Sequence, residues 1–511
     1  MALIEIIPWH QAITGVVIFS LLAFLIAPAL SWSRKIPGPF LAKFTRLWYF
    51  WQNYQCDFHW TNVKLHREKG KIVQIMPGYF SIDDPKSHKI MYGLGLNAWP
   101  KGEFYLAWAV SSDPQITNLF AARDQSLHAG MRRKVASMYS MTSLVSYEPY
   151  VNHCIDRLHD HFDKASSTGS LLNLGHWLQF YAFDAVSMIT FGERMGFLDE
   201  GKDVHGMIQS LDDTHTVLTL AGVYPRLTPL VKTVAGFFTG DKLLFHQKFA
   251  GEKIDMARKE QRDVTSDGPA TMVSKFLDAQ RRGDEKKAFS DWDVISNAGS
   301  NIGAGSDTTA IALISIVYNV FRDPAILKRA RDEMDEAGLP DRPSFPEAQK
   351  LPFLQAVIKE SMRLLPGFGL PLWREVPKGG AMVCGQFFPE GANLGVNPWV
   401  SHHNKEVYGE DADVFRPERW LECSGDQLAS MEQSLIPFGL GSRTCIGQNV
   451  SMLEITKVIP VLLRDFDFYF LDEHGASEKR DYIELENKWF MKAPHLHARI
   501  VKRATPSFVG V

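Results

Sequence analysis

The stretch Phe438-Gly-Leu-Gly-Ser-Arg-Thr-Cys-Ile-Gly447 presents one cysteine, Cys445, among glycines and directly before a predicted helix. Helix N-termini, cations and metal ions favour a thiolate over a thiol, and the thiolate is the form that binds metal. Arg443 adds a forked cation suited to a carboxylate. Phe438 can cover the sulfur, while Gly447 lets a flat ligand approach the backbone closely. The stretch therefore predicts a metal-ligating thiolate beside a carboxylate-bearing group.

A buried structural cysteine in a turn is the alternative interpretation of this stretch, but the full pattern Phe-x-x-Gly-x-Arg-x-Cys-x-Gly argues against it. A zinc site is disfavoured because no CxxC or HxxxH partner lies near. The chain has five cysteines. Such an odd and sparse set does not indicate a disulfide framework, and it fits a reducing compartment.

A second unusual pattern, Ala304-Gly-Ser-Asp-Thr-Thr309, interrupts the longest apolar run, Trp292–Phe321. Glycine costs about 1 kcal/mol in a helix interior, and Ser and Thr compete for backbone carbonyls. Asp307 and Thr308 supply an acid and a hydroxyl that can relay protons. A simple helix cap or kink is the alternative that this pattern alone leaves open.

One face of this predicted helix has a composition suited to binding a flat group. Helical spacing places Asn301, Ala304, Gly305 and Thr308 on that face. Ala304 and Gly305 lack bulk, so a planar cofactor and dioxygen could lie against them.

Two further motifs predict a buried ionic network. Glu360-Ser-Met-Arg363 has the i, i+3 spacing of a helical ion pair, although such pairs usually lie on the surface. Phe415-Arg-Pro-Glu-Arg-Trp420 contributes Arg419, which could join Glu360 and Arg363. We expect such a network to be structural and not catalytic.

The sequence predicts a mainly helical fold with small β-sheets, of the α+β class. A hairpin is expected around Pro77-Gly78, small strands and turns between 366 and 400, and strands again from 466 to 501. Long helices are expected at Gln125–Tyr139, Leu144–Lys164, Leu174–Thr190, His205–Ala221, Lys242–Arg262 and Trp292–Phe321. A shorter helix is expected at Leu354–Leu364, and a further helix from Cys445 to about Leu463. Because no long Gly/Ser linker interrupts residues 34–511, we predict that they form one domain.

Residues 1–33 are predicted to be a membrane anchor. The run Ala12–Leu30 is apolar and close to the ~20 residues that span a bilayer as a helix. Arg34 and Lys35 follow it, which predicts a single-pass topology with the domain in the cytosol, as at the endoplasmic reticulum membrane. A cleaved signal peptide is the alternative, but the positive charges follow the apolar run instead of preceding it. The net charge of −3 makes nucleic acid a poor candidate partner.

Together these patterns resemble the cytochrome P-450 superfamily, from the Pro37-Gly38-Pro39 hinge to the C-terminal tail. The resemblance implies a mostly helical triangular prism with small sheets on one side and a haem between its two longest core helices. It also implies that Cys445 is the axial thiolate ligand. Asp307 and Thr308 would be the oxygen-activating pair.

The same resemblance assigns positions around the haem. Arg443 matches a propionate contact, and Arg374 looks like a further one. His128 and Arg132 match a His-x-x-x-Arg variant of another propionate site, where many members have Trp first. Glu360, Arg363 and Arg419 match the family's structural triad.

Within the superfamily, the sequence is similar to the fungal pisatin-demethylase-like group, whose members oxidise secondary metabolites. The similarity rests on Leu351–Glu360, Gly395–Trp399, Tyr408–Asp413 and Trp489-Phe490. Trp373 departs from the small residue or proline usual before Arg374, which puts the pocket shape in doubt. The predicted pocket is largely apolar, which suggests a lipophilic ligand, and comprises Trp99, Phe104, Trp108, Asn301, Ala304, Phe368, Leu370 and Phe490.

The implied reaction is R–H + O₂ + 2e⁻ + 2H⁺ → R–OH + H₂O at haem b. No flavin or nicotinamide segment is left over, so electrons would come from NADPH through a separate membrane-bound reductase, with cytochrome b5 as a second candidate donor. Arg133, Lys134 and Lys457 are candidates for its docking face, and an ordinary solvated face is the alternative.

Two other functions are compatible with such a sequence. A haem-thiolate isomerase or dehydratase would use no external dioxygen, and some relatives of that kind lack the acid–alcohol pair that Asp307 and Thr308 form here. A non-catalytic haem or lipid carrier would bind haem and consume no NADPH. A zinc hydrolase is excluded for want of clustered ligands.

Overall fold

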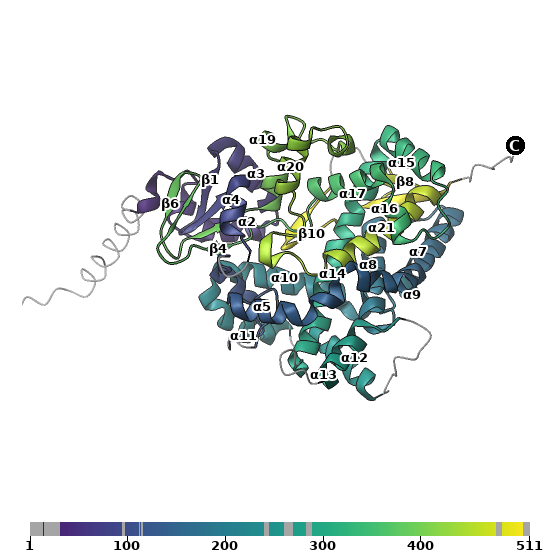
Figure 1. Cartoon of the computed structure of the whole chain (residues 1–511), viewed down its shortest axis with the longest axis horizontal. Helices are drawn as coiled ribbons and strands as arrows, with labels where there is room; N and C mark the ends of the chain where they lie inside the picture. The colour runs from purple at the N-terminus through teal and green to yellow at the C-terminus, as the bar shows by residue number, and fades with distance from the viewer. Residues whose placement is uncertain are drawn as a thin grey trace, which may run out of the picture.

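The computed structural model describes residues 31–94, 98–111, 116–239, 245–259, 269–282, 289–476 and 483–503, together with Thr14 and Asp113. Long helices form the core, and α14 runs through the centre of the molecule (Figure 1). These core helices are α7 (Glu148–Thr168), α8 (Leu174–Phe191), α14 (Asp291–Arg322), α17 (Pro352–Leu364) and α21 (Gln448–Asp465). α14 packs against α8, α17 and α21, and its position decides where the central cavity lies.

The sequence of α14 explains both its start and its burial. Ser290 caps the helix: its hydroxyl accepts a hydrogen bond from the Asp293 amide, and the Asp293 carboxylate accepts one from the Ser290 amide. This capping box satisfies amides that would otherwise lack partners. Among the described residues, α14 is the helix whose length and composition would allow it to cross a membrane, and it is mostly buried inside the protein. Its apolar character is therefore that of a core helix.

Shorter helices surround this core. They are α2 (Leu47–Tyr54), α3 (Phe58–Lys69), α4 (Pro85–Met91), α5 (Gln125–Val135), α6 (Met141–Leu144), α9 (Phe197–Glu200), α10 (Met207–Val223), α11 (Thr228–Thr239), α12 (Phe245–Lys259), α13 (Met272–Arg282), α15 (Pro324–Glu336), α16 (Phe345–Gln349), α18 (Pro398–His402), α19 (Lys405–Tyr408) and α20 (Gly425–Ser434). α10 contacts α12, and α12 also packs on α14.

The sheets are small and mostly antiparallel. In the largest, the strand order is β1-β2-β7-β4, and β2 pairs in parallel only with β7. Gly78 sits in the β1–β2 turn with a φ of 77°, a left-handed conformation that glycine adopts without steric cost. The strands of this sheet are β1 (Ile72–Met76), β2 (Tyr79–Ile82), β4 (Arg374–Glu375) and β7 (Asn393–Gly395).

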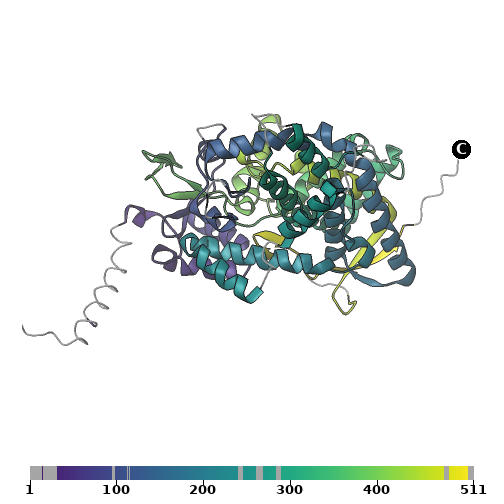
Figure 2. The ribbon, with the colours of Figure 1, turned by 90° about the horizontal axis from the view of Figure 1, so that it is seen from below.

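Three further sheets lie elsewhere in the chain. β5 (Ala381–Val383) pairs with β6 (Gln386–Phe388), and β9 (Glu486–Lys488) pairs with β10 (Phe490–Lys492). The third has the order β3-β11-β8, with β3 (Leu171–Asn173), β8 (Phe466–Leu471) and β11 (His497–Lys502). Figure 2 shows the sheet with β1 and β2 at one end of the molecule and β8 and β11 at the other, with helices between them.

The predicted class agrees with this architecture, and the deviations occur mainly at helix ends. The predicted helix Gln125–Tyr139 is α5 followed by a 3-10 turn, Ala136–Tyr139. α7 begins at Glu148 and not at Leu144, because Pro149 lacks an amide hydrogen and is suited to a first helical turn. The predicted anchor helix lies outside the described residues, and the division into residues 1–33 and 34–511 stays a prediction.

Candidate active site

A cavity of about 280 Å³ lies between α14, α5 and the loop that carries Cys445. Its wall is mostly apolar, as is usual for small-molecule sites. None of its described lining residues is acidic. The side chains that enclose it include Leu119, Phe120, Val186, Leu365, Phe368, Leu372, Phe438, Ile446, Trp489 and Phe490.

The Cys445 loop is held in place by hydrogen bonds and by glycines that cannot be replaced freely. The amide of Cys445 donates to the Phe438 carbonyl over 2.8 Å. Gly439 and Gly441 have φ values of 73° and 63°. A Cβ atom at Gly441 would lie 1.7 Å from the Tyr92 carbonyl oxygen, so only glycine fits there. The loop therefore holds Cys445 at a defined place on the cavity wall, just before α21.

The Cys445 side chain is exposed to the cavity although it lies deep in the molecule. Burial raises the pKa of its thiol, while the Gly447 and Gln448 amides and the Arg132 charge lower it. The balance is a raised pKa, so these protein groups do not by themselves stabilise the thiolate. A bound metal ion would supply the missing stabilisation, because coordination deprotonates a thiol.

One end of the cavity is crowded with positive charge. His128, Arg132, Arg374 and Arg443 line it, as does Lys101, which the sequence analysis had missed. Burial, followed by the Arg443 charge, lowers the pKa of His128 to about 3. Burial and the Arg374 charge lower the pKa of Lys101 well below its ordinary value and that of Arg443 to about 10. Such repulsion is expected where cations await an anionic partner.

Hydrogen bonds fix the orientation of these cations. Arg132 donates to the Thr444 carbonyl over 2.7 Å, and Arg443 donates to the Ala122 carbonyl over 2.5 Å. The Arg443 Nε is buried and has no hydrogen-bond partner among the described residues. A buried donor without an acceptor is costly. The cationic end therefore fits a ligand with carboxylates, such as the propionates of a haem.

The residues expected on one face of α14 do line the cavity, namely Asn301, Ala304, Gly305 and Thr308. The Thr308 hydroxyl donates to the Ala304 carbonyl over 2.7 Å. Asn301 accepts a hydrogen bond of 2.6 Å from the Tyr139 hydroxyl, which holds its amide in place. A Cβ atom at Gly305 would lie 3.0 Å from Val186, so close packing of α8 favours glycine there in addition to the needs of a ligand.

Asp307 does not line this cavity, which differs from the catalytic position predicted for it. Its carboxylate is buried on another side of α14, where it accepts a 2.6 Å hydrogen bond from Gln179 and lies 2.7 Å from the Lys492 Nζ. Successive residues on a helix point in different directions, so Thr308 and Asp307 face different neighbours. Any action of Asp307 on the cavity must pass through another group.

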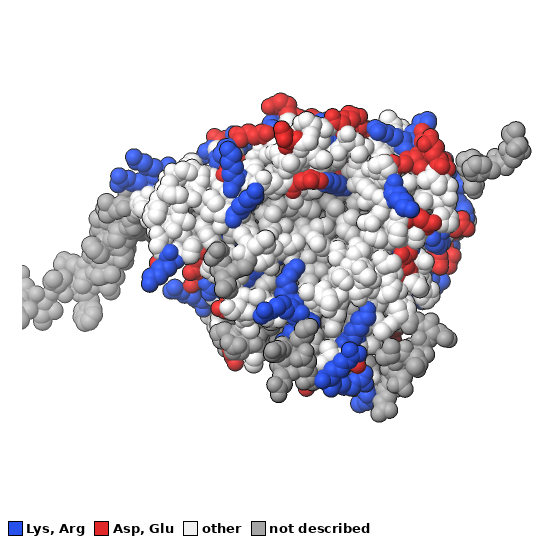
Figure 3. All heavy atoms as spheres, viewed as in Figure 1, with Lys and Arg blue, Asp and Glu red and all other residues white. Residues whose placement is uncertain are grey.

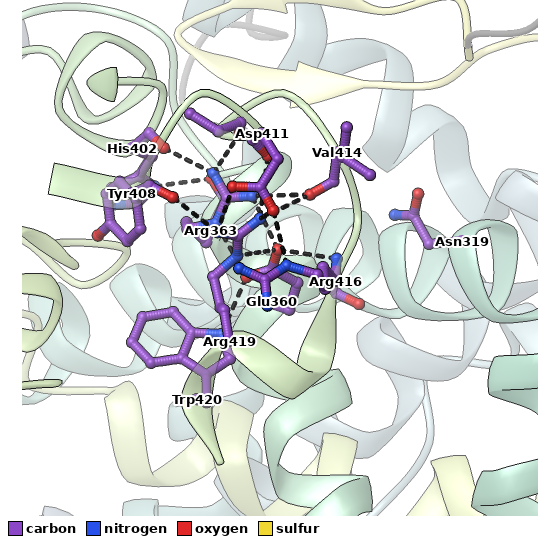
Figure 4. Close-up of polar contacts among 12 residues, drawn as sticks. Asn319, Glu360, Arg363, His402, Tyr408, Asp411, Val414, Arg416, Arg419 and Trp420 are labelled. Carbon is purple, nitrogen blue, oxygen red and sulfur yellow. Dashed lines mark hydrogen bonds and ion pairs between the residues drawn. The ribbon is translucent and has the colours of Figure 1, made fainter. Parts of the chain in front are cut away.

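Glu360, Arg363 and Arg419 form one buried network, drawn in Figure 4. Arg363 donates to both carboxylate oxygens of Glu360 over 2.9 and 2.8 Å, and Arg419 donates over 2.9 Å. The Trp420 indole adds a fourth side-chain hydrogen bond to Glu360 at 2.9 Å. Arg363 also donates to the carbonyl of His402 over 2.7 Å. The network ties α17 to the segment that precedes the Cys445 loop, and none of its three charged members lines the cavity.

Four of the residues predicted to line the pocket do not, because they are core residues. Phe104 and Leu370 are completely buried in a hydrophobic cluster with Trp373, and Trp108 packs at the edge of the same cluster. Trp99 belongs to a different cluster around β2 and β7. By contrast, Phe368 and Phe490 line the cavity as predicted.

Trp373, the residue that departs from the family's pattern, does not change the cavity wall directly. It is fully buried, with its ring centroid 5.1 Å from that of Tyr79 and 6.3 Å from that of Tyr49. Its neighbours Leu372 and Arg374 are the residues that line the cavity. Trp373 therefore fills the core behind the wall.

Trp489 lines the cavity and was not predicted to do so. It forms the turn between β9 and β10 with a φ of 81°, an uncommon conformation for a bulky residue. Its ring packs against Trp108, Phe120 and Phe104 with centroid distances of 5.1, 5.5 and 5.7 Å. Strand alternation would have pointed Trp489 away from Phe490, and the left-handed turn places both at the cavity. The only signal in the sequence that could have indicated Trp489 as a cavity residue was its place directly before Phe490.

The fold and this site define a haem-thiolate protein, and comparison with known proteins agrees. Residues 41–483 match the family model described as Cytochrome P450, and the chain belongs to that family. It is 37% identical to a pisatin demethylase of Fusarium vanettenii over 98% of this chain and 96% of that protein. It is 35% identical to a cytochrome P450 monooxygenase of Aspergillus terreus over 91% of this chain and 97% of that one. The chain is therefore a cytochrome P450 monooxygenase homologue, and the family's chemistry uses a thiolate-bound haem, dioxygen and electrons from a reductase.

Proposed function

We propose that this protein inserts one oxygen atom from O₂ into a lipophilic small molecule, with Cys445 as the axial ligand of haem b. The observation that carries the proposal is a single cavity lined by Cys445, by the small-residue face of α14 and by an unneutralised cationic end. Bound there, haem would supply the oxidising chemistry, with the thiolate donating electron density to the iron.

The residues of the chain have distinct roles in this proposal. The two propionates are held by Arg132, Arg374, Arg443 and Lys101, which gives each of these cations the anionic partner that it lacks. The neutral His128 adds a hydrogen-bonding imidazole. Phe438 covers the sulfur, and Gly447 leaves room beside it, since a Cβ atom there would lie 3.8 Å from the Cys445 sulfur. Ala304 and Gly305 leave space for dioxygen. The Thr308 hydroxyl holds a proton at the cavity wall.

The substrate in this proposal is a secondary metabolite with aromatic or apolar surface. Phe120, Phe368, Trp489 and Phe490 line the cavity, and aromatic walls favour such ligands. One relative is named a pisatin demethylase and others are fungal monooxygenases, which supports hydroxylation, O-demethylation or a related oxidation.

The electron donor in this proposal is an NADPH-dependent cytochrome reductase, with cytochrome b5 as a second donor. On the face of the molecule shown in Figure 3, Lys and Arg side chains gather over the part that carries α5. Arg133 on α5 is exposed, whereas Lys134 pairs with Asp293 at 2.8 Å. Lys457, predicted to join this face, is buried and pairs with Glu148 at 2.7 Å, so it cannot dock a partner. Arg133 therefore remains the candidate from the predicted set.

Attachment to the endoplasmic reticulum membrane with a cytosolic domain is also part of the proposal. Near the start of the described chain, Phe40, Leu41 and Leu47 are 71%, 56% and 62% exposed. Leu230 at the start of α11 is 62% exposed, and the Phe50–Tyr224 ring contact links α2 to the segment that leads into α11. Exposed apolar side chains of this kind fit a membrane surface beside the predicted anchor. Sedimentation with membranes after deletion of residues 1–33 tests the two contributions.

The function can be tested with microsomes that contain this protein, a reductase, NADPH, ¹⁸O₂ and a fungal metabolite extract, with Cys445→Ala as the control. A Cys445-dependent product that carries one labelled oxygen, or that lacks a methyl group, is expected. A Cys445-dependent product that is isomeric with its precursor or has lost only water would instead establish the isomerase or dehydratase. Haem binding without NADPH consumption would indicate a non-catalytic haem or lipid carrier.

A further inference from the structure

The face of α14 that lines the cavity carries a serine, Ser300, whose hydroxyl has no partner in the described part of the chain. Between Asp293 and Phe321, Ser300 and Ala304 are exposed while the other residues of the helix are buried or half-buried. Both residues line the cavity, which accounts for their exposure. The Ser300 hydroxyl forms no hydrogen bond with any residue that the structure describes.

Other hydroxyls of the same helix are bonded to its own backbone. The Ser306 hydroxyl donates to the Ile302 carbonyl over 2.9 Å, and the Thr308 hydroxyl donates to the Ala304 carbonyl over 2.7 Å. A serine inside a helix either bonds a carbonyl of the preceding turn in this way or directs its hydroxyl away from the helix. Ser300 takes the second course and presents its hydroxyl to the cavity.

Asn297, one turn earlier on α14, presents a second polar group. Its amide nitrogen donates to the Asp293 carbonyl over 2.7 Å, which fixes the side chain. Its Oδ1 accepts no hydrogen bond within the described chain, and Asn297 also lines the cavity. Residues three apart on a helix have Cβ atoms about 5–6 Å apart. The Asn297 Oδ1 and the Ser300 hydroxyl, which we call the polar pair, therefore lie close together.

The other hydroxyl and amide side chains of the cavity wall, away from its cationic end, already have partners in the protein. Asn301 accepts a hydrogen bond of 2.6 Å from Tyr139 and donates one of 3.2 Å to Thr190. The hydroxyls of Thr444 and Ser451 are likewise hydrogen-bonded. Among the described hydroxyl and amide groups of this part of the wall, the polar pair is thus the one left for a ligand.

The polar pair lies some distance along α14 from the residues beside the proposed oxygen site. An α-helix rises about 1.5 Å per residue, so Ser300 lies about 6 Å from Ala304 and about 12 Å from Thr308 along the axis. All three residues line the cavity that also contains Cys445. A ligand that contacts the polar pair and is oxidised beside Thr308 must span this length.

The chemistry of the polar pair matches a hydroxyl group. A hydroxyl both donates and accepts hydrogen bonds. It can donate to the Asn297 Oδ1 while its oxygen accepts from the Ser300 hydroxyl. A carbonyl or ether oxygen only accepts, so it would leave the Asn297 Oδ1 buried without a donor, which is costly.

We propose that Ser300 and Asn297 determine substrate specificity by binding a free hydroxyl group of the substrate at a point remote from the carbon that is oxidised. The proposal rests on the monooxygenase function and names the substrate class more closely, as a ring-bearing apolar alcohol or phenol. Aromatic residues of the wall, such as Phe368 and Phe490, contact its apolar body. The bound hydroxyl decides which end of the molecule faces Thr308.

Phenylimidazoles test this contact in the holoprotein without turnover. An imidazole nitrogen binds haem iron directly, and the shift of the haem absorption band gives the dissociation constant. We would compare 4-phenylimidazole and its one-ring-longer biphenyl analogue with their hydroxylated isomers. Ser300→Ala and Asn297→Leu should each weaken at least one hydroxylated isomer by about 10-fold, the scale of one hydrogen bond, and its parent compound by under about 2-fold. If neither variant weakens a hydroxylated isomer more than its parent, the proposal is overturned.

Ser306→Ala is the matched control. Ser306 lies on the same helix, but its hydroxyl donates to the Ile302 carbonyl and it does not line the cavity. We expect it to leave the affinity ratio of hydroxylated and parent compounds unchanged. A loss as large as that of Ser300→Ala would indicate a general disturbance of α14 and would overturn the assignment of Ser300. The carbon monoxide difference spectrum of each variant shows whether the thiolate-bound haem is kept.

The labelled-oxygen experiment separates a failure of this proposal from a failure of the proposed function. The substrate found there should carry a free hydroxyl group, and Ser300→Ala should weaken its binding by about 10-fold. A substrate without a hydroxyl group would overturn the contact and leave the monooxygenase function intact. A hydroxyl-dependent loss of imidazole affinity in a protein that forms no Cys445-dependent oxidised product would support the contact and overturn the monooxygenase function.

Discussion

The Gly441 backbone passes so close to Tyr92 that a Cβ atom at position 441 would overlap the Tyr92 carbonyl oxygen. Gly441→Ala should therefore displace the Cys445 loop, and its left-handed φ adds strain. We expect destabilisation by at least about 2–3 kcal/mol, typical of severe core substitutions, and loss of the thiolate-dependent carbon monoxide difference spectrum. Urea unfolding measures the first effect. Gly425→Ala, where a Cβ atom meets nothing, should change neither quantity by much.

Glu360→Gln tests the buried network of α17. The substitution keeps the shape but removes the carboxylate that Arg363 and Arg419 share, and both arginines are almost completely buried. Breaking a buried pair in this way costs about 3–5 kcal/mol, measured by the shift of the urea midpoint. Glu418→Gln removes a carboxylate from the more exposed pair with Arg329, where a loss of under about 1 kcal/mol is expected. Equal losses would contradict the assigned role of the network.

Lys101→Met should have opposite effects on the haem-free and haem-loaded protein. Without an anionic ligand, burial and repulsion from Arg374 and Arg443 disfavour the Lys101 charge, so the substitution should raise the melting temperature of the haem-free protein. With propionates present, the same substitution removes one of their partners and should speed haem loss to apomyoglobin. If the substitution stabilises both the haem-free and the haem-loaded form, or destabilises both, Lys101 is not a propionate contact.

Asp83 predicts a pH dependence of stability. Burial raises the pKa of its carboxyl to about 7, against which the hydrogen bond from Asn404 acts only partly. A folded-state pKa above the unfolded value means that the native state binds more protons, so stability falls as pH rises from about 4 through about 7. The urea midpoint measured from pH 5 to pH 8 should fall in the wild type.

Asp83→Asn should flatten this fall, because the amide does not ionise. The neighbouring Asp84→Asn is a suitable control, since Asp84 caps α4 through a hydrogen bond to the Ser87 amide and asparagine can also cap. If Asp84→Asn flattens the profile and Asp83→Asn does not, the ionisation has been assigned to the wrong carboxyl.

Sequence motifs predicted the parts of this fold that depend on interactions between residues close together in the chain. The long apolar run predicted α14, and helical spacing predicted that Asn301, Ala304 and Thr308 lie on one face, which lines the cavity. The spacing of Glu360 and Arg363 predicted their ion pair, and the predicted buried network with Arg419 is the arrangement that the structure has.

Features that depend on distant partners could not be predicted in this way. Lys457 was expected on the surface because lysine side chains usually are exposed, but in the structure it is buried and forms an ion pair with Glu148. The direction of Asp307 depends on Lys492 and Asp212, which come from separate segments. Lys101 belongs to an irregular loop, where no periodicity indicates which side chain turns inward.

The order in which the chain leaves the ribosome bears on the Trp489 turn described above. The cavity takes Lys101 from early in the chain, Cys445 from late in it, and Trp489 and Phe490 from almost its end. Synthesis proceeds from the N-terminus, so the cavity wall is incomplete until the segment that carries Trp489 and Phe490 has been made. A cofactor in this cavity is therefore enclosed only after residues 489 and 490 have been made, and a chain that stops before residue 489 lacks this part of the wall.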